Sequence, residues 1–420
     1  MAHEHDLIIV GAGMVGATLA LALALADSDL RIAVVDALPL DLLPQQPAAT
    51  ASGYDPRVSA LSAASERIFS HLGVWPLIAD DRGCAYQHMC VWDAEGTGEI
   101  RFDAAALDES RLGHIVENKR IQHALLQRLA QTEVAMLGGR RIETLICEDD
   151  GWRLKLAGGE SLRAPLIVAA DGAHSRVREL AGFALREWDY LHHAVVTTVQ
   201  LAEPHQDTAW QRFLPTGPLA FLPLPDQDGA HYCSIVWSLL PDAADRVMAL
   251  DDAAFAREIG AAMEGRLGRI VAADPRHRIE LRQRHAKTYA MQGLVLVGDA
   301  AHTIHPLAGQ GVNLGLLDAA ELNDVLRAAI RRGESPADLA VLQRYERRRM
   351  GANLGMMTAM EGFERLFHAD ALPLRWLRNA GMQWLDQQGK LKSLVIRRAM
   401  GLDGDLPSLA KNPELDVGSC

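Results

Sequence analysis

The sequence predicts a mixed α/β fold with a parallel sheet, a second domain built on an antiparallel sheet, and helices at the C-terminal end. Glycine-rich segments predict the parallel sheet, because two of them directly follow a short apolar strand and precede a helix. These strands are Asp6–Val10 and Leu294–Val297. The antiparallel sheet is predicted by β-type runs within Glu187–Trp237, such as His193–Gln200 and His231–Trp237.

The first glycine-rich segment has the strand, turn and helix order of a dinucleotide-binding fingerprint. The strand Asp6–Val10 is followed at once by three glycines and then by an apolar helix over Ala17–Ala26. Gly11 permits the tight turn, Gly13 lets a pyrophosphate approach the backbone, and Gly16 lets the helix pack close to the strand. We therefore expect a pyrophosphate at this turn.

A second strand, Arg31–Val35, ends at Asp36. Its place after the fingerprint is that of the carboxylate that binds a ribose. The uncharged run Leu7–Ala26 also has about the length of a membrane span. We disfavour a span because three glycines interrupt the run, and because the residues before it lack Lys and Arg, which also disfavours a cleaved signal peptide.

The segment Gly293–Gly315 has a similar order of strand, acidic turn, glycine loop and helix start. Gly298 and Asp299 follow the strand directly, where a carboxylate can bind a sugar hydroxyl. Beyond them, bare backbone N–H groups lead to a helix N-terminus, and such groups suit a pyrophosphate or an electron-rich ring. The residues of this loop are Pro306, Gly309, Gln310, Gly311, Val312 and Asn313.

A third strand, Ala164–Ala170, ends in Asp171 and Gly172, and Ser175 then leads into a helix. Glycine at the turn and a polar helix start again suit a nucleotide. An ordinary capped turn has the same residues, so this segment alone predicts no site.

The composition disfavours several other classes of protein. The chain has 420 residues, of which 49% are hydrophobic, enough for a sizeable core and more than one domain. Its net charge of −12 disfavours nucleic-acid binding. The five cysteines contain no CxxC pair and fit the reduced thiols of a cytoplasmic protein better than disulfides or a zinc site.

Together, the three motifs resemble those of the group A flavoprotein aromatic hydroxylases, in which all three bind one FAD. Within that group the chain is similar to the bacterial ubiquinone-biosynthesis hydroxylases through almost its whole length. Among their subgroups it looks most similar to the 2-polyprenylphenol 6-hydroxylases, which act at ring position C5. The segments that carry this narrower resemblance are Arg57–Leu61, His114–Asn118, Trp188–His193, Phe221–Leu224, Ser234–Ser238 and His302–Gly315.

The resemblance implies a Rossmann-like FAD domain with a mixed-sheet substrate domain, as in para-hydroxybenzoate hydroxylase. It assigns Asp36 to the adenosine ribose, where relatives more often have Glu, and Asp299 to the ribityl chain. Pro306, Gly309, Gln310 and Gly311 would line the flavin ring as the loop where catalysis takes place. The implied cofactor contacts are Gly11, Gly13, Gly16, Asp36, Arg57, Asn118, Asp171, Gly172, Gly298, Asp299, Gly311, Val312 and Asn313.

The resemblance also implies the reaction. In this family, reduced flavin reacts with O2 to form a C4a-hydroperoxide, whose distal oxygen is attacked by an electron-rich phenol ring. NAD(P)H reduces the flavin as a transient co-substrate, which agrees with the single complete dinucleotide fingerprint. The expected function is hydroxylation of a polyprenylated phenol at C5. Hydroxylation at C1 or C6 and a non-catalytic, FAD-bearing scaffold subunit are the alternatives.

Structural alternatives stand beside several of these residues. Arg57 also fits a solvated surface arginine, and Asn118 fits a helix cap. His302 and His305 have the spacing of a metal pair, but the nearest carboxylate belongs to the flavin motif and no cysteine lies close, so no metal is expected. The pair His192–His193, at a strand start, is read as structural.

Three aromatic residues and one proline of the predicted antiparallel sheet are candidates for the wall of an apolar substrate pocket. Each is equally expected as plain core, because aromatic residues in strands usually pack there. The candidates are Phe213, Phe221, Pro223 and Trp237. No residue is singled out as a catalytic base.

These anchors divide the chain into three parts. The C-terminal part, residues 346–420, is helical and has arginines among Met, Leu and Trp, with helices expected over Ala340–Ala359 and Phe363–Met400. A loop is expected over Leu38–Ser52. The FAD domain is expected to combine residues 1–75, 100–182 and 283–345, and the substrate-binding sheet to combine residues 76–99 and 183–282.

A polyprenylated substrate resides in the membrane, so a cytoplasmic enzyme needs peripheral contact with the inner membrane or a partner that presents the lipid. The basic C-terminal helices suit an anionic bilayer or other subunits of a ubiquinone-biosynthesis complex, and a solvated helix face is an equal alternative. A homo-oligomer is also compatible with the sequence.

Overall fold

The computed structural model describes residues 5–26, 29–40, 50–79, 82–304, 311–368, 372–402 and 404–412. Its first layer is a six-stranded sheet with the order β19-β20-β12-β1-β2-β8, parallel except for β19. The strands are β1 (Leu7–Val10), β2 (Ile32–Val35), β8 (Ala135–Leu137), β12 (Leu166–Ala169), β19 (Ala290–Met291) and β20 (Leu294–Leu296).

Helix α1 (Met14–Leu25) packs between α4 (Asn118–Leu129) and α8 (Gly311–Arg331). Residues 16–23 of α1 are all buried, which explains why this helix is apolar on every face. The run Leu7–Ala26 is therefore a strand and a short buried helix. None of the helices in the described parts of the chain combines the length and apolar content that crossing a membrane requires.

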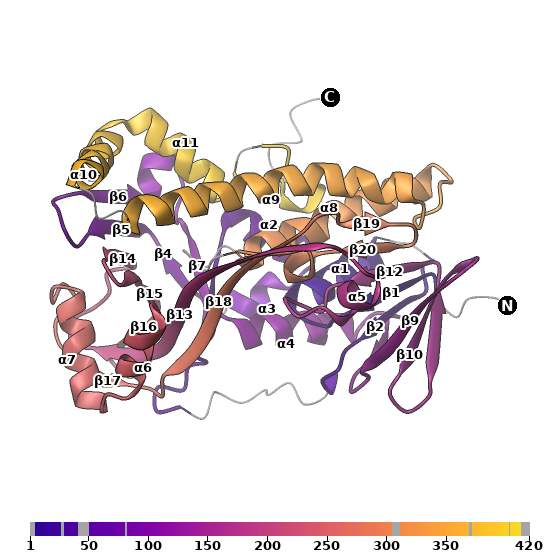
Figure 1. Ribbon diagram of the computed structural model, residues 1–420, viewed down its shortest axis with the longest axis horizontal. Helices are drawn as coiled ribbons and strands as arrows, with labels where there is room; N and C mark the ends of the chain where they lie inside the picture. The colour runs from indigo at the N-terminus through magenta and orange to yellow at the C-terminus, as the bar shows by residue number, and fades with distance from the viewer. Residues whose placement is uncertain are drawn as a thin grey trace.

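The second large sheet has the order β21-β18-β13-β16-β15-β14-β5-β6, with β17 paired to β13. Its long strands β13 and β18 run across the molecule (Figure 1). One face is covered by α6 (Pro241–Met248) and α7 (Asp252–Ala262), which share a core with it. The strands are β5 (His88–Asp93), β6 (Glu99–Asp103), β13 (Leu185–Leu201), β14 (Thr208–Leu214), β15 (Gly217–Gln227), β16 (Ala230–Leu239), β17 (Ile270–Ala273), β18 (His277–Ala286) and β21 (His302–Thr303).

Beside the two large sheets, the fold has two three-stranded sheets and several short helices. One sheet has the order β3-β7-β4 and the other β11-β10-β9. Their strands are β3 (Val58–Leu61), β4 (Cys84–Tyr86), β7 (Gly113–Glu117), β9 (Ile142–Glu148), β10 (Gly151–Leu156) and β11 (Ser161–Ala164). The short helices are α2 (Ala63–His71), α3 (Trp75–Ala79), η2 (Ala104–Leu107), α5 (Arg176–Leu180) and η3 (Gly298–Ala300).

The C-terminal region contains α9 (Leu339–His368), α10 (Leu372–Gln387), α11 (Gly389–Ala399) and η5 (Ser408–Ala410). Helix α9 lies along one edge of the molecule, and α10 and α11 lie at its end, near β5 and β6 (Figure 1). Asn379 fixes α10 there, because its Oδ1 accepts a 2.7 Å bond from the Gly98 N–H and its Nδ2 donates to Asp93 over 3.1 Å.

The predicted mixed α/β fold is confirmed, and the three motif strands agree with their sequence ranges within one or two residues. The helix expected over Ala340–Ala359 continues to His368, and the run that follows divides into α10 and α11. Most of the expected loop Leu38–Ser52 lies outside the described residues. The proposed domain boundaries stay predictions.

Candidate functional site

The strands that precede the three motifs are neighbours in the parallel sheet, in the order β20-β12-β1-β2. The carboxyl ends of parallel strands lie at the same edge of a sheet, which is where such folds bind ligands. The structure therefore brings Asp299, Asp171, Gly11 and Asp36 to one edge, although Gly11 and Asp299 are far apart in the sequence.

The fingerprint turn requires glycine at two positions. Gly11 has a φ of +106°, and a Cβ there would lie 2.3 Å from the Ala170 carbonyl oxygen. A Cβ on Gly16 would lie 2.0 Å from the Gly11 carbonyl oxygen, so only glycine lets α1 pack this close. Gly13 differs, because a Cβ there would meet no atom within 4 Å. The space in front of α1 is open.

Asp36 braces the same turn. One carboxylate oxygen accepts a 2.6 Å bond from the Ala12 N–H, and the other accepts a 2.8 Å bond from the Leu38 N–H. Gln122 donates to the Ala12 carbonyl oxygen over 2.9 Å. Asp36 thus positions the fingerprint backbone and keeps lone pairs that can accept from a sugar hydroxyl, as the sequence prediction requires.

The segment around Asp171 and Gly172 is tied to the turn around Asp299. Asp171 Oδ2 accepts bonds of 2.7 Å and 3.2 Å from the first N–H groups of α5, whereas burial raises the pKa of its carboxyl against the effect of these bonds. The buried Arg178 donates from Nη1 to the Ala300 carbonyl oxygen and from Nη2 to the Ala173 carbonyl oxygen, each over 2.9 Å. Arg178 therefore joins the second and third motifs.

Asp299, Arg57 and Asn118 all line a cavity of about 1000 Å³ between the two large sheets. Asp299 is exposed to this cavity but otherwise surrounded by protein, and this burial raises the pKa of its carboxyl, while the charges of His302 and Arg57 oppose the shift. The alternative that Asn118 caps a helix is wrong, because Glu117 occupies the N-cap of α4. Asn118 instead accepts a 2.6 Å bond from Ser59 Oγ.

Helix α8 begins at Gly311, beside this cavity. The predicted flavin-ring residues Pro306, Gly309 and Gln310, as well as His305, lie outside the described residues. The Asn313 side chain is committed to the protein. Its Oδ1 accepts from the Ser62 N–H at 3.0 Å and from Ser65 Oγ at 2.7 Å, and its Nδ2 donates to the Ala60 carbonyl oxygen at 2.8 Å. A hydrogen bond from Asn313 to a cofactor would therefore have to use its backbone N–H group.

A buried ionic network centred on Asp318 supports the Gly298–Asp299 turn. Asp318 of α8 is fully buried and accepts bonds from His302 Nε2 at 2.5 Å and from the Gly298 N–H at 3.1 Å. Its other oxygen accepts from Arg349 Nε at 2.7 Å and from Asn353 Nδ2 at 3.2 Å. Burial alone would raise the pKa of Asp318, but His302 and Arg349 outweigh it and hold this pKa well below its usual range.

One face of the nine-stranded sheet forms the floor of the cavity. Its lining includes charged side chains of β18, among them Arg278, Arg282 and Arg284, and small or aliphatic side chains from β18 across to β14. The small or aliphatic side chains alternate along the strands with larger residues that face α6 and α7. The cavity-facing residues of the sheet include Ala194, Val196, Gln211, Pro218, Ala220, Leu222, Val236, Ser238, Ile279 and Leu281.

The aromatic residues expected as candidates for the pocket wall do not line this cavity. Phe221 and Trp237 belong to the core beneath α6 and α7, which is the plain-core alternative. Phe213 and Pro223 are buried and are likewise not among the lining residues. Because successive side chains of a strand point to opposite faces, the neighbours of Phe221, Ala220 and Leu222, face the cavity instead.

Comparisons with known proteins fit this geometry. The model of a family described as an FAD binding domain matches residues 4–359. The chain belongs to this family. It is 40% identical to a 3-demethoxyubiquinol 3-hydroxylase of Escherichia coli, over 94% of this chain and 98% of that protein. It is 35% identical to the ubiquinone hydroxylase UbiL of Rhodospirillum rubrum, over 94% and 89%. The crystal structure of p-nitrophenol 4-monooxygenase PnpA from Pseudomonas putida has the same fold, with a TM-score of 0.75, 21% identity, and coverage of 96% of this chain and all of that one.

The protein is accordingly an FAD-dependent monooxygenase. The described residues fit the cofactor, because the N-cap of α1 is Gly13, which has no capping side chain, and the first turn has no acidic residue. Such an uncapped N-terminus facing open space suits a pyrophosphate. The cavity over the second sheet, which begins at Asp299 and Arg57, leaves room for the ring system and a substrate. The residue roles inferred from the sequence remain predictions.

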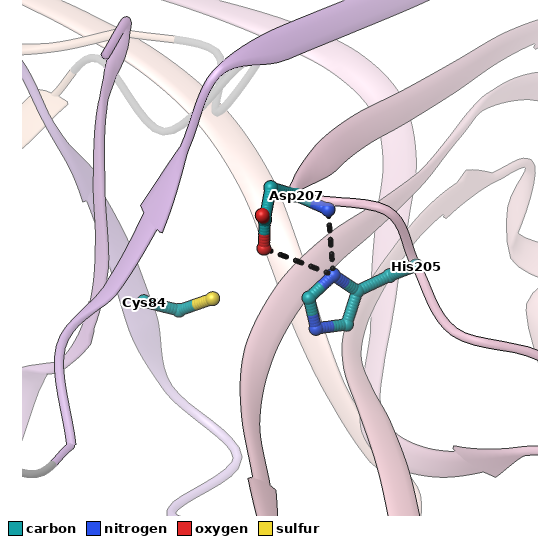
Figure 2. A group of neighbouring side chains, drawn as sticks. All are labelled: Cys84, His205 and Asp207. Carbon is teal, nitrogen blue, oxygen red and sulfur yellow. Dashed lines mark hydrogen bonds and ion pairs between the residues drawn. The ribbon is translucent and has the colours of Figure 1, made fainter. Parts of the chain in front are cut away.

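A second cluster of metal-binding residue types lies away from this site. Ligand atoms of Cys84, His205 and Asp207 lie within 4.8 Å of one another. Figure 2 shows how these three side chains lie. His205 Nε2 bonds the Leu224 carbonyl oxygen at 2.9 Å and must be the donor, so Nδ1 accepts the Asp207 N–H at 3.1 Å. Burial raises the pKa of the Cys84 thiol to about 12. Both ring nitrogens are occupied and the thiol stays protonated, so these residues are structural.

Sequence reasoning missed the groups that hold the motifs in place. Arg178 lies in the helix that follows the Asp171–Ser175 segment, but only its hydrogen bonds in the structure show that it bridges Ala173 and Ala300. Asp318 and Arg349 carried no local signal. One pattern would have indicated a buried pair. Asp318 stands among the apolar positions of α8, and Arg349 stands among those of α9.

Proposed function

We propose that this monooxygenase hydroxylates the aromatic ring of a polyprenylated intermediate of ubiquinone biosynthesis, using NAD(P)H and O2. The observation that carries this proposal is the 40% identity to a 3-demethoxyubiquinol 3-hydroxylase along nearly the whole of both chains. The apolar floor of the cavity supports it, because Ala194, Ala220 and Val236 offer a flat surface without charge to an aromatic ring.

Bound FAD would supply the activation of O2 and the transfer of one oxygen atom to the ring. The chain would hold the cofactor at Gly11, Gly13 and Gly16 and orient the substrate on the sheet. Small side chains at Ala194, Ala220 and Ser238 leave space for the ring, while the buried core behind them keeps this floor rigid. The apolar part of this floor would exclude water, so that less of the activated oxygen is lost without hydroxylation of the ring.

Two candidates differ in the substrate and in the ring carbon that is hydroxylated. The name of the Escherichia coli relative favours 3-demethoxyubiquinol as substrate. The sequence motifs favour C5 of a polyprenylphenol, and this step is the second candidate. A scaffold subunit that binds FAD without turnover is the third, and it is disfavoured because all three FAD motifs are intact and a scaffold has no physical need to preserve them.

Quinone profiling in two bacterial strains separates these candidates. One strain lacks its 3-demethoxyubiquinol hydroxylase and the other its C5 hydroxylase, and each receives this chain. Restored ubiquinone with loss of 3-demethoxyubiquinone in the first strain alone supports the leading proposal, and rescue of the second strain alone supports C5. If neither strain recovers and the purified FAD-loaded protein shows no substrate-stimulated NAD(P)H oxidation, the scaffold role replaces both.

A further inference from the structure

Two polar side chains interrupt the apolar part of the cavity floor. Strands β14, β15 and β16 contribute six lining residues, of which two are polar, Gln211 of β14 and Ser238 of β16. Gln211 is 7% exposed and Ser238 is 3% exposed, so both are more than nine-tenths buried. The other four are Pro218, Ala220, Leu222 and Val236.

The strand geometry turns both side chains toward the cavity. Successive side chains of a strand point to opposite faces, and the next residue along each strand belongs to the other face. Arg212 donates to the Ala262 carbonyl oxygen at the end of α7 over 2.6 Å, and Trp237 packs in the core beneath α6 and α7. Gln211 and Ser238 therefore face the opposite side, where the cavity lies.

The protein itself provides no hydrogen-bond partner for either group. Within the parts of the chain that the structure describes, no donor or acceptor bonds the Gln211 amide or the Ser238 hydroxyl. Polar groups buried to this extent are almost always paired, because an unpaired group has lost its hydrogen bonds to water. Water can serve both groups in the free enzyme, but an aromatic ring that displaces this water has to replace its bonds. The two groups are therefore suited to a ring that bears oxygen atoms.

The distance between the two groups indicates how many oxygens the ring has. Gln211 is paired with Ala220, Ala220 is paired with Val236, and Ser238 is the next residue after Val236 on the same face. Two strand spacings and one two-residue step separate the Cα atoms of Gln211 and Ser238 by about 12 Å. This span accommodates one six-membered ring with oxygens at two opposite positions and a hydrogen bond to each oxygen. A phenol with a single oxygen would satisfy only one of the two groups.

We propose that Gln211 and Ser238 determine the substrate specificity of this cavity, because each forms a hydrogen bond with one of the two opposite oxygens of a quinol ring. The amide and the hydroxyl can each donate to, or accept from, a ring hydroxyl. Ala220 and Val236 lie between them and contact the face of the ring. The inference rests on the proposed function and deepens it, since the leading substrate candidate is a quinol and the second is a phenol.

Ligand binding to the FAD-loaded full-length protein tests this. The probes are 2-prenylhydroquinone and 2-prenylphenol, which differ only in the hydroxyl opposite the first, and the change in flavin absorbance is followed without NAD(P)H or O2. We expect the quinol to bind about fivefold more tightly than the phenol, the factor for one neutral hydrogen bond. Gln211→Met and Ser238→Ala should each weaken quinol binding by about the same factor. The double variant should bind the two probes equally.

Two matched variants serve as controls. Ser234→Ala removes a hydroxyl from the same strand and the same face, but Ser234 is 0% exposed and is not among the lining residues. Gln200→Met changes a half-buried glutamine of β13 that also lies outside the lining. Both controls should keep the wild-type preference for the quinol.

The outcomes separate this inference from the proposed function. Equal binding of the two probes to the wild-type protein overturns the inference and leaves the proposed function standing, and this comparison needs no variant. A preference for the quinol that persists in the double variant also overturns it. If neither probe binds, the inference and the proposed polyprenylated substrate both fail.

Discussion

Replacing Asp318 with Asn removes the charge at the centre of the buried network beneath the Gly298–Asp299 turn. The carboxylate accepts four hydrogen bonds, two on each oxygen, from His302, Gly298, Arg349 and Asn353. An amide has one oxygen, so its NH2 group must face two of these donors. If the oxygen stays with Arg349, His302 can change tautomer and accept, but the Gly298 N–H loses its acceptor.

The size of the stability loss follows from the burial of Asp318 and Arg349. Asp318 is 0% exposed and Arg349 is 7% exposed, so the guanidinium would be left without its counter-charge in a site closed to water. Breaking a buried pair in this way costs about 3–5 kcal/mol. At about 2 °C per kcal/mol for a large domain, the unfolding midpoint should fall by about 6–10 °C. Loss of the bond that holds Gly298 should weaken FAD binding about tenfold, the factor for about 1.4 kcal/mol.

Thermal unfolding of the apoprotein and FAD titration by flavin fluorescence measure the two effects. Asp324→Asn is the matched control, because Asp324 lies on the same helix but is only half-buried, and its hydrogen-bond partners Ser408 and Asn323 are neutral. Its midpoint should stay within about 2 °C of wild type. A midpoint of Asp318→Asn as close to wild type as that of the control, with unchanged FAD affinity, would refute the view that the ionised Asp318 holds the turn.

Three further predictions use the same protein. Gly13→Ala should weaken FAD binding but leave the unfolding midpoint of the apoprotein unchanged. Gly16→Ala should lower that midpoint, because only the Cβ at position 16 meets protein atoms. Equal midpoints of the two variants would contradict this. Burial, with help from His302 and Arg186, lowers the pKa of His285 to about 4, so the unfolded chain takes up a proton near pH 6.5 that the folded one refuses. Stability should therefore fall by about 2 kcal/mol from pH 7 to pH 5, and His285→Gln should flatten this slope in unfolding scans. Ala220→Leu should raise KM for the proposed polyprenylated substrate with FAD content unchanged, and an unaltered KM would remove Ala220 from the proposed substrate floor.

Local chemistry explains why the glycine turn and the meeting of the three motifs at one sheet edge were predictable. A tight turn needs glycine at Gly11 and a close helix needs it at Gly16, so the sequence itself records the backbone geometry. Parallel strands then bring the three motifs to one edge whatever their separation in the chain. The supports at Asp318 and Arg349 were not predictable, because their pairing depends on how α8 and α9 pack and no spacing rule links them.

The substrate floor shows a different limit. Alternation predicts that Phe221 and Ala220 face opposite sides of the sheet, but not which side meets the cofactor. Polarity usually decides this, and in β15 it does not, because the residues of this strand that face the cavity and those that face the core are both apolar. Size is what distinguishes them. The face that packs against α6 and α7 has Leu219, Phe221 and Trp237, whereas the cavity face has Ala194, Ala220 and Ser238. A sheet that must fill its own core on one side and leave space on the other has to alternate large with small, and this pattern is legible in the sequence of β15 once the second layer is known.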